Sequence, residues 1–258
     1  MAIMIEPDEP PPFRVLRPDA ASRFLLTADH AGNLIPRRLA NLGVSEAERG
    51  RHIGWDIGIA GVTEVLSALL GAPAVFQVYS RLVIDCNRRP DVASAFPVIS
   101  EMTPIPGNVG LDKADKDARR QAIFDPYHQA IDGLIAARRA QGRTPIYVAM
   151  HSFTPIYQGV PRPMDVAVLY HRRPRLSRAL AGLLVAEGEL VVAENEPYSV
   201  SDETDYGVPV HAEHGDLDYV EIEIRQDLIE TPEGQAEWGR RLARLLPRAV
   251  AMLDRATA

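Results

Sequence analysis

Two histidines occupy positions from which imidazole could hold a metal ion. His30 follows the apolar run Phe24–Ala28, and His151 follows the apolar run Ile146–Met150. Both runs have the length and composition of buried strands. Ligands of open α/β sheets bind outside the carboxyl ends of strands, so the two imidazoles are expected in one cleft. A single histidine at a strand end is usually a hydrogen-bonded structural group, but two of them together predict a metal site.

A metal site with two histidines needs a third, harder ligand. Catalytic zinc typically has three protein ligands, for example two histidines and a carboxylate, and keeps one position for water. We predict Asp56 as the carboxylate, because it begins a predicted helix after a glycine-containing turn. Two alternatives stay open: Asp56 as the N-cap of that helix, and His52 as the third ligand.

Asn87 and Arg88 follow the predicted strand Leu82–Asp85. A planar guanidinium makes a bidentate pair with a carboxylate, and a neighbouring amide adds direction. This pattern favours recognition of a small acidic substrate, with Arg81 as a further positive charge ahead of the strand. The alternative is a structural ion pair between the aspartate of the strand and an arginine.

The segment Tyr219–Arg225 alternates between polar and apolar residues. Because side chains of a strand point alternately to its two faces, Glu221, Glu223 and Arg225 share one face. Such a strand either faces solvent at the edge of a sheet or lines a cleft. In the cleft interpretation Glu223 is a general base, and Arg225 orients it or contacts the substrate.

Three other polar residues are candidates for the site. Ser152 lacks the flanking sequence of a hydrolase nucleophile and is expected to contact the substrate instead. His211 and His214 are either surface residues or part of a lid.

The elements that position these residues alternate between strand-like and helix-like segments. Strands separated by helices predict an α/β fold, with a mostly parallel mixed sheet flanked by helices on both faces. The expected strands are Phe24–Ala28, Ala74–Tyr79, Leu82–Asp85, Ile146–Met150, Val166–Tyr170, Leu190–Glu194 and Tyr219–Ile224. The expected helices are Asp56–Leu70, about Ala114–Gln141 with an interruption at Asp125-Pro126, one after Pro174, and Thr231–Arg255.

The distribution of proline and polar residues divides the chain. Residues 1–18 are rich in proline and are expected to form a flexible arm without helix or sheet. Residues 19–258 are expected to form one domain with two long loops, 91–110 and 195–218. Long loops in a compact domain are more often functional than accidental.

The composition excludes several classes of protein. A net charge of −7 argues against a dedicated nucleic-acid binder, and no apolar run is long enough to span a membrane. The first residues lack the apolar core of a signal peptide, so a cytoplasmic protein is expected. Cys86 is the one cysteine, so no internal disulfide and no thiolate-only zinc site can form. Alternation along its predicted strand turns Cys86 into the core.

Four of these segments, in this order, resemble the N-formylglutamate amidohydrolase family over about residues 22–230. The resembling stretches are Ala28–Pro36, Ser80–Arg88, Met150–Ser152 and the strand that carries Glu223. That family is in turn similar to the zinc carboxypeptidases, whose Asp-x-Asn-Arg, His-Ser and Glu-aliphatic-Arg motifs resemble Asp85–Arg88, His151-Ser152 and Glu223–Arg225.

The resemblance implies a fold, a cofactor and roles for particular residues. It implies a zinc-carboxypeptidase-like (phosphorylase/hydrolase-like) fold and a place in histidine degradation. One zinc ion, or another divalent metal, is implied on His30 and His151. Asn87 and Arg88 would hold a substrate carboxylate, and Glu223 would be the base.

Two features depart from the family patterns. The carboxypeptidases have His-x-x-Glu where this chain has His30–Asn33, so the missing carboxylate is expected from Asp56. Better-known family members have Pro-His-Ser-Gly where this chain has Asp29–Gly32, which indicates a side branch whose substrate need not be N-formylglutamate.

These observations predict a metal-dependent amidohydrolase of a small acidic N-acyl amino acid, such as N-formyl-L-glutamate, which would yield formate and glutamate. Glu223 would act as base, Arg81 would stabilise the oxyanion, and Asn87, Arg88, Arg225 and Ser152 would contact the substrate. One alternative is a related zinc hydrolase of peptides or cell-wall amides. The other is a non-catalytic binder of acidic ligands with a decayed metal site.

Overall fold

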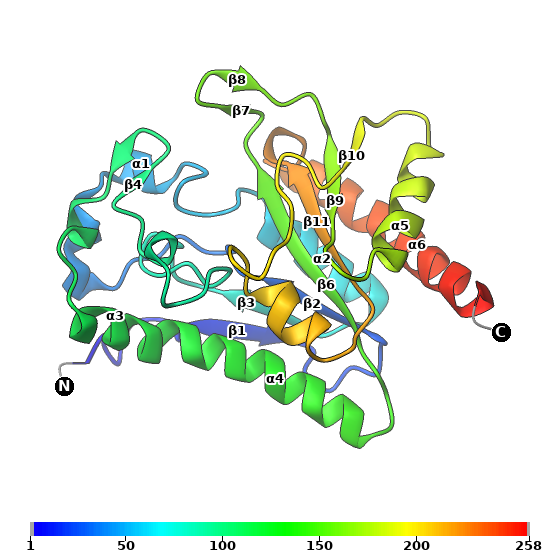
Figure 1. Ribbon diagram of the computed structural model, residues 1–258, viewed down its shortest axis with the longest axis horizontal. Helices are drawn as coiled ribbons and strands as arrows, with labels where there is room; N and C mark the ends of the chain where they lie inside the picture. Colours follow the sequence, from blue (N-terminus) through cyan, green and yellow to red (C-terminus); the bar gives the residue numbers. More distant parts are fainter. Residues whose placement is uncertain (1–2, 257–258) are drawn as a thin grey trace.

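The computed structural model describes residues 3–256, and a seven-stranded sheet runs through its centre (Figure 1). The strand order is β1-β3-β2-β6-β11-β9-β10. β3, β2, β6 and β11 are parallel, whereas β1 pairs antiparallel with β3, and β9 antiparallel with β11. The strands are β1 Phe13–Leu16, β2 Phe24–Ala28, β3 Ala74–Gln77, β6 Ile146–Phe153, β9 Val166–Leu169, β10 Val192–Glu194 and β11 Tyr219–Arg225.

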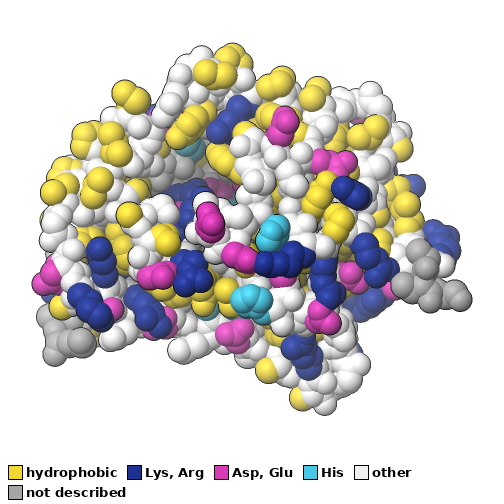
Figure 2. All heavy atoms as spheres, in the orientation of Figure 1, with side chains coloured by type: hydrophobic (Ala, Val, Ile, Leu, Met, Phe, Trp, Pro, Cys, Tyr) yellow, Lys and Arg dark blue, Asp and Glu magenta, His cyan; other side chains and the backbone are white. Residues whose placement is uncertain are grey.

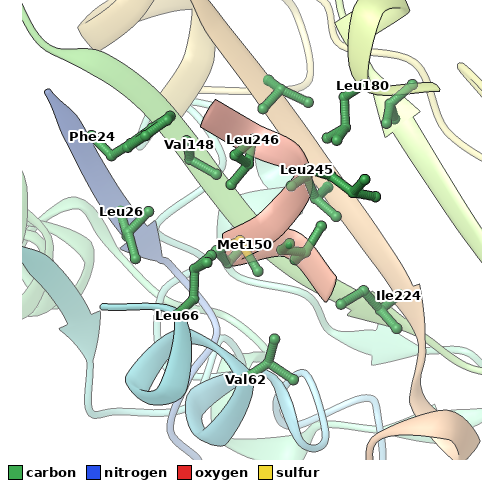
Figure 3. Packing of buried hydrophobic residues seen from close by; sticks show 14 of the residues in the cluster. Phe24, Leu26, Val62, Leu66, Val148, Met150, Leu180, Ile224, Leu245 and Leu246 are labelled. Carbon is green, nitrogen blue, oxygen red and sulfur yellow. The ribbon is translucent and has the colours of Figure 1, made fainter. Parts of the chain in front are cut away.

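Helices cover both faces of this sheet, so the predicted fold class is confirmed. On one face α2, α5 and α6 pack against apolar side chains of β2, β6 and β11, as Figure 3 shows for Leu66, Leu180 and Leu246. On the other face α4 packs against the sheet through Tyr127 and Ile131. The helices are α1 Glu46–Arg49, α2 Ile59–Leu70, α3 Lys113–Arg119, α4 Asp125–Ala140, α5 Arg175–Val185 and α6 Pro232–Ala256.

The remaining regular segments are short. Two hairpins stand outside the main sheet, β4 Ile99–Ser100 with β5 Thr103–Pro104, and β7 Ile156–Tyr157 with β8 Val160–Pro161. The 3₁₀ segments are η1 Arg37–Gly43, which is kinked at residues 40–42, η2 Ala93–Ala95, η3 Pro106–Asn108 and η6 Gln226–Leu228. The π-helical segments are η4 Arg120–Phe124 and η5 Gly207–Glu213.

The interruption expected at Asp125-Pro126 takes the form of a π-helical segment. Proline has no N–H and its ring clashes with the preceding turn of an α-helix. The chain widens into η4 directly before Pro126 and then resumes as α4, so α3, η4 and α4 follow one another without a loop. Proline therefore interrupts the helix without ending it.

The predicted strand Leu82–Asp85 is wrong. The chain makes a tight turn there, in which the backbone N–H of Val83 donates to the carbonyl of Ser80 at 2.9 Å. Leu82, Val83 and Ile84 are all buried. A continuous apolar run indicates burial, and burial under a loop satisfies it as well as burial in a sheet.

The expectation for residues 1–18 is also corrected. Residues 13–16 form β1 at the edge of the sheet, and the carbonyl of Pro12 accepts a hydrogen bond from the backbone of Val78 at 3.1 Å. The prolines precede this strand, so they remove no N–H from its ladder. Residues 1–2 of the expected arm and residues 257–258 of the expected domain lie outside the described part. The division into an arm and one domain stays a prediction.

No helix within residues 3–256 is long and apolar enough to cross a membrane.

Gly32, two residues after His30, lies very close to the backbone of Val78, which follows β3. A substitution of Gly32 tests whether this close approach is needed for stability. A Cβ atom at Gly32 would lie 2.1 Å from the carbonyl oxygen of Val78. We expect Gly32→Ala to lower the free energy of unfolding in urea by about 1–3 kcal/mol, because the backbone has to shift. Gly182→Ala is the control, since its Cβ would meet nothing within 4 Å in α5, and alanine there should be neutral or stabilising. Equal stabilities of Gly32→Ala and the unchanged protein would contradict the packing argument.

Candidate metal centre and active site

A pocket opens at the carboxyl ends of β2, β6 and β11. Its cavity of about 350 Å³ is lined by His30, Asp56, His151 and Glu223, among others. Figure 2 shows this face hollowed, with acidic and basic side chains inside. Glu223 and His151 are paired across the β6–β11 ladder, so the parallel register itself brings them together.

His30, Asp56 and His151 form a candidate metal centre, as predicted from the strand ends. Their ligand atoms lie within 4.8 Å of one another, and all three residues are buried. The Asp56 Oδ2 atom is 3.5 Å from His30 Nδ1 and 3.0 Å from His151 Nδ1. His30 Nδ1 is buried without a hydrogen-bond partner among the described residues. Two imidazole nitrogens and one carboxylate oxygen suit a divalent cation such as zinc.

Two hydrogen bonds to backbone groups hold Asp56 close to the two histidines. Its N–H donates to the carbonyl of His30 at 2.9 Å, and its Oδ2 accepts from the N–H of Ser152 at 3.2 Å. Gly58, at a φ of 80°, lets the chain turn from Asp56 into α2. Gly58 holds the N-cap position, so Asp56 is not the helix cap.

The charges of the centre balance one another. Burial opposes a charge on His30 and on His151, but the surrounding carboxylates outweigh it and raise the pKa of both imidazoles. Burial alone would raise the pKa of Asp56, but the two histidines lower it below its ordinary value. Positive charge between the three side chains is therefore favourable. A divalent cation supplies such charge and displaces protons from the imidazoles.

A second carboxylate, Asp85, orients His30. Its Oδ1 is 2.7 Å from His30 Nε2, and its Oδ2 accepts from Arg81 at 2.8 Å. Because Nε2 faces a carboxylate, it carries the proton, and Nδ1 is left free for a metal. Asp29 stands in a similar place by His151, with Oδ2 at 3.7 Å from Nε2.

The sequence did not predict that Asp85 orients His30, whereas the ion pair of Asp85 with Arg81 is the structural pair left open above. Metal-binding histidines almost always donate their second ring N–H to a carboxylate, a carbonyl or water. Aspartates directly before His30 and inside the Asp-x-Asn-Arg motif were the available signal.

Glu221 and Glu223 line the pocket from the interior of the sheet. β11 lies between β6 and β9, so the strand lines a cleft and is not an edge strand. Burial raises the pKa of Glu223 to about 7 and that of Glu221 to about 8. The Oε2 atom of each has no hydrogen-bond partner within the described chain. A carboxyl group with a pKa near neutrality can both accept and donate a proton at physiological pH.

Asn87 and Arg88 line the same pocket and connect it to the loop 195–218. Asn87 Oδ1 accepts from the backbone N–H groups of Tyr206 at 3.2 Å and Gly207 at 2.9 Å. Arg88 Nη1 is 2.9 Å from Asp205 Oδ1. The loop therefore helps to hold both side chains predicted to bind a carboxylate.

Arg81 and Ser152 also line the pocket and support its carboxylates. Besides Asp85, Arg81 faces Asp56 at 3.4 Å. The Ser152 hydroxyl donates to the carbonyl of Ile57 at 2.9 Å, which fastens the loop that carries Asp56.

Arg225 is the predicted site residue that the structure does not bring to the pocket. Its guanidinium is 2.7 Å from Asp227 and 3.1 Å from Asp165. It shares a face with Glu223 by alternation, but these two carboxylates hold it where the strand ends.

The other histidines lie outside the centre. His52 lines the pocket but faces Glu101 at 3.5 Å. His214 is exposed, whereas His211 is buried, with Nε2 at 2.8 Å from His128 Nδ1. His128 in turn reaches the carbonyl of Cys86 at 2.9 Å.

Cys86 itself faces away from the pocket, as predicted. Its thiol accepts a hydrogen bond from Gln77 at 3.1 Å, and it is fully buried. The turn, and not strand alternation, gives it this direction.

A second group of possible metal ligands consists of His171, Asp202 and Glu213. The negative charge of its two carboxylates is already balanced by an arginine. The guanidinium of Arg172 bonds both carboxylates, at 2.9 Å for Asp202 Oδ1 and 2.6 Å for Glu213 Oε2. This group is therefore not a metal candidate.

Comparisons with known proteins agree over most of the chain. A model of the family described as N-formylglutamate amidohydrolase matches residues 22–230. The crystal structure of gene product Atu2144 from Agrobacterium tumefaciens is 37% identical, covers 97% of this chain and 99% of that chain, and superposes with a TM-score of 0.93. An N-formylglutamate amidohydrolase from Ralstonia eutropha JMP134 shares the fold at 22% identity and a TM-score of 0.69, over 95% of this chain and 99% of that chain. No curated protein matches the chain.

The metal centre predicts the metal content of three variants. We expect the unchanged protein to hold about one zinc ion per chain, and His151→Ala less than about 0.2. Asp85→Asn should weaken zinc binding by about 10- to 100-fold, because His30 loses its orienting carboxylate. Elemental analysis and competition with a chelator measure both quantities. Asp227→Asn, a carboxylate change outside the pocket, is the control. Equal zinc contents of His151→Ala and the control would contradict the assignment.

Proposed function

Because the chain belongs to the N-formylglutamate amidohydrolase family, we propose that it is a metal-dependent hydrolase of the amide bond in a small acidic N-acyl amino acid. N-formyl-L-glutamate is the model substrate, with formate and glutamate as products. The observation that carries the proposal is the Nδ1 atom of His30, which no described residue hydrogen-bonds and which lies 3.5 Å from Asp56. A carboxyl oxygen of Glu223, likewise without a partner in the described chain, lines the same pocket.

The bound metal would activate water and the carbonyl group, and Glu223 would transfer the proton. His30, Asp56 and His151 would hold a zinc ion, which lowers the pKa of bound water from about 15.7 towards 7 and polarises a carbonyl group. Glu223 takes a proton from the attacking water and passes it to the leaving amide nitrogen. Burial raises the pKa of this carboxyl group, which favours uptake of the proton, whereas the charge of a bound zinc ion would lower the pKa and favour its release.

Three polar side chains of the pocket position the substrate. Arg88 pairs with the substrate carboxylate, and Asn87 directs the same group. Arg81 stabilises the negative oxygen that develops at the acyl carbon. Asp85 holds the Arg81 guanidinium through two N–H groups, so this charge is in place before the substrate binds.

Two features favour this function over the alternatives. A cavity of about 350 Å³ suits a small molecule better than a peptide or a cell-wall polymer. Asp56 replaces the glutamate missing from the His-x-x-Glu motif, which argues against a decayed site. Zinc as the metal and a place in histidine degradation rest on the family resemblance and belong to this proposal, together with a cytoplasmic location.

The role of Glu223 is tested by Glu223→Gln. We expect kcat for N-formyl-L-glutamate to fall by about 10²- to 10⁴-fold, since glutamine cannot take the proton. KM and the zinc content should stay close to those of the unchanged protein. Steady-state assays of formate release, with elemental analysis of the same samples, provide the readout. Full activity in Glu223→Gln would show that another group is the base.

The role of Arg88 is tested by Arg88→Gln. Loss of a charged hydrogen bond to the substrate carboxylate should raise KM by about 10- to 100-fold and change kcat less. Arg89→Gln is the matched control, because Arg89 is an exposed arginine that pairs with Asp91 outside the pocket, and KM should not change there. An unchanged KM in Arg88→Gln would place the carboxylate elsewhere.

A further inference from the structure

Arg162 lies against two tyrosines of the pocket, with its guanidinium near both aromatic rings. It follows β8, in the hairpin that extends from β6 beyond His151 (Figure 1). The guanidinium carbon lies 4.8 Å from the ring centre of Tyr157 and 5.0 Å from that of Tyr198. Both tyrosines line the pocket.

The charged surroundings of Tyr198 include both Glu223 and Arg162. Burial and then Glu223 raise the pKa of Tyr198, whereas Arg162 lowers it. The charges of Glu223 and of the Arg162 guanidinium therefore both affect the pKa of Tyr198. The hairpin is tied across the pocket mouth, because the backbone N–H of Gln158 donates to Glu101 Oε1 at 3.2 Å.

Arg162 differs from the other arginines around the pocket in having no carboxylate partner. Arg81 pairs with Asp85, and Arg88 pairs with Asp205. Arg162 forms no ion pair with any carboxylate within residues 3–256, and its Nη1 is buried without a hydrogen-bond acceptor there. A buried, unpaired charged donor is unfavourable, and cation–π contacts offset only part of the loss. An anionic oxygen would satisfy this Nη1 donor, which no described residue satisfies.

We propose that Arg162 binds a second carboxylate of the substrate, so that the enzyme selects N-acyl amino acids with an acidic side chain. This inference rests on the proposed function. Arg88 binds the carboxylate that every N-acyl amino acid carries, whereas Arg162 engages one that only a dicarboxylate offers. The rings contact the guanidinium carbon, whereas the N–H groups lie in the plane of the guanidinium. A carboxylate can therefore accept hydrogen bonds from two of these N–H groups at once. Arg162 is thus a specificity-determining residue.

The test compares two substrates of nearly equal shape, N-formyl-L-glutamate and N-formyl-L-glutamine, in the zinc-loaded protein. We expect kcat/KM to favour the glutamate substrate by about 10- to 100-fold, as for the loss of one charged hydrogen bond. Arg162→Gln should remove most of this preference, mainly by raising KM for the glutamate substrate. The kcat/KM for the glutamine substrate should stay within about threefold, which also shows that the variant folds. Arg162→Lys should restore part of the preference, since it keeps the charge and loses the planar fork.

Several outcomes would overturn the inference. Equal losses for both substrates in Arg162→Gln would make the residue structural. An unchanged preference in Arg162→Gln would assign the selection to another group. If the unchanged protein cleaves both substrates equally well and Glu223→Gln cleaves neither, the amidohydrolase function stands and the role of Arg162 fails. If the unchanged protein cleaves neither substrate, both proposals fail.

Discussion

The buried carboxylate of Asp56, shared between two imidazoles, is the interaction on which the rest of the site depends. A buried carboxylate is tolerated only where positive charge and hydrogen-bond donors surround it. His30 and His151 supply the charge, and the backbone N–H of Ser152 supplies a donor. The same convergence produces a geometry that a divalent cation can occupy in place of protons.

Further hydrogen bonds connect this centre to segments without regular structure. Asp85 links His30 to Arg81, so one carboxylate orients a metal ligand and a positive charge together. On the far side of the Asp85–Arg88 turn, His128 bonds the carbonyl of Cys86 and is itself 2.8 Å from His211. Since His211 belongs to η5, this chain anchors the loop 195–218 whose backbone bonds Asn87. The loop 195–218 is therefore held by polar contacts to the site.

Sequence patterns predicted most of the fold and much of the site. Phe24–Ala28 and the strand of Glu223 were recognisable because buried strands leave an apolar run or a strict alternation. Leu82–Asp85 was misread, because an apolar run reports burial and not hydrogen bonding. β1 was missed because the prolines before it obscured a short edge strand. Arg225 was assigned to the pocket from its face of the strand, while the carboxylates that hold it lie elsewhere in the chain.

By itself the sequence determined the fold class, the two histidines at strand ends, Asp56 as the candidate third ligand, and the family. These follow from periodicity and from short motifs, which depend on neighbours along the chain. Only the tertiary structure decided that Asp56 reaches both histidines, that Asp85 orients His30 and that Arg162 has no carboxylate partner within residues 3–256. Those facts depend on distances between residues far apart in the sequence, such as Asp56 and His151. No local pattern encodes them, because the folding of the whole sheet sets them.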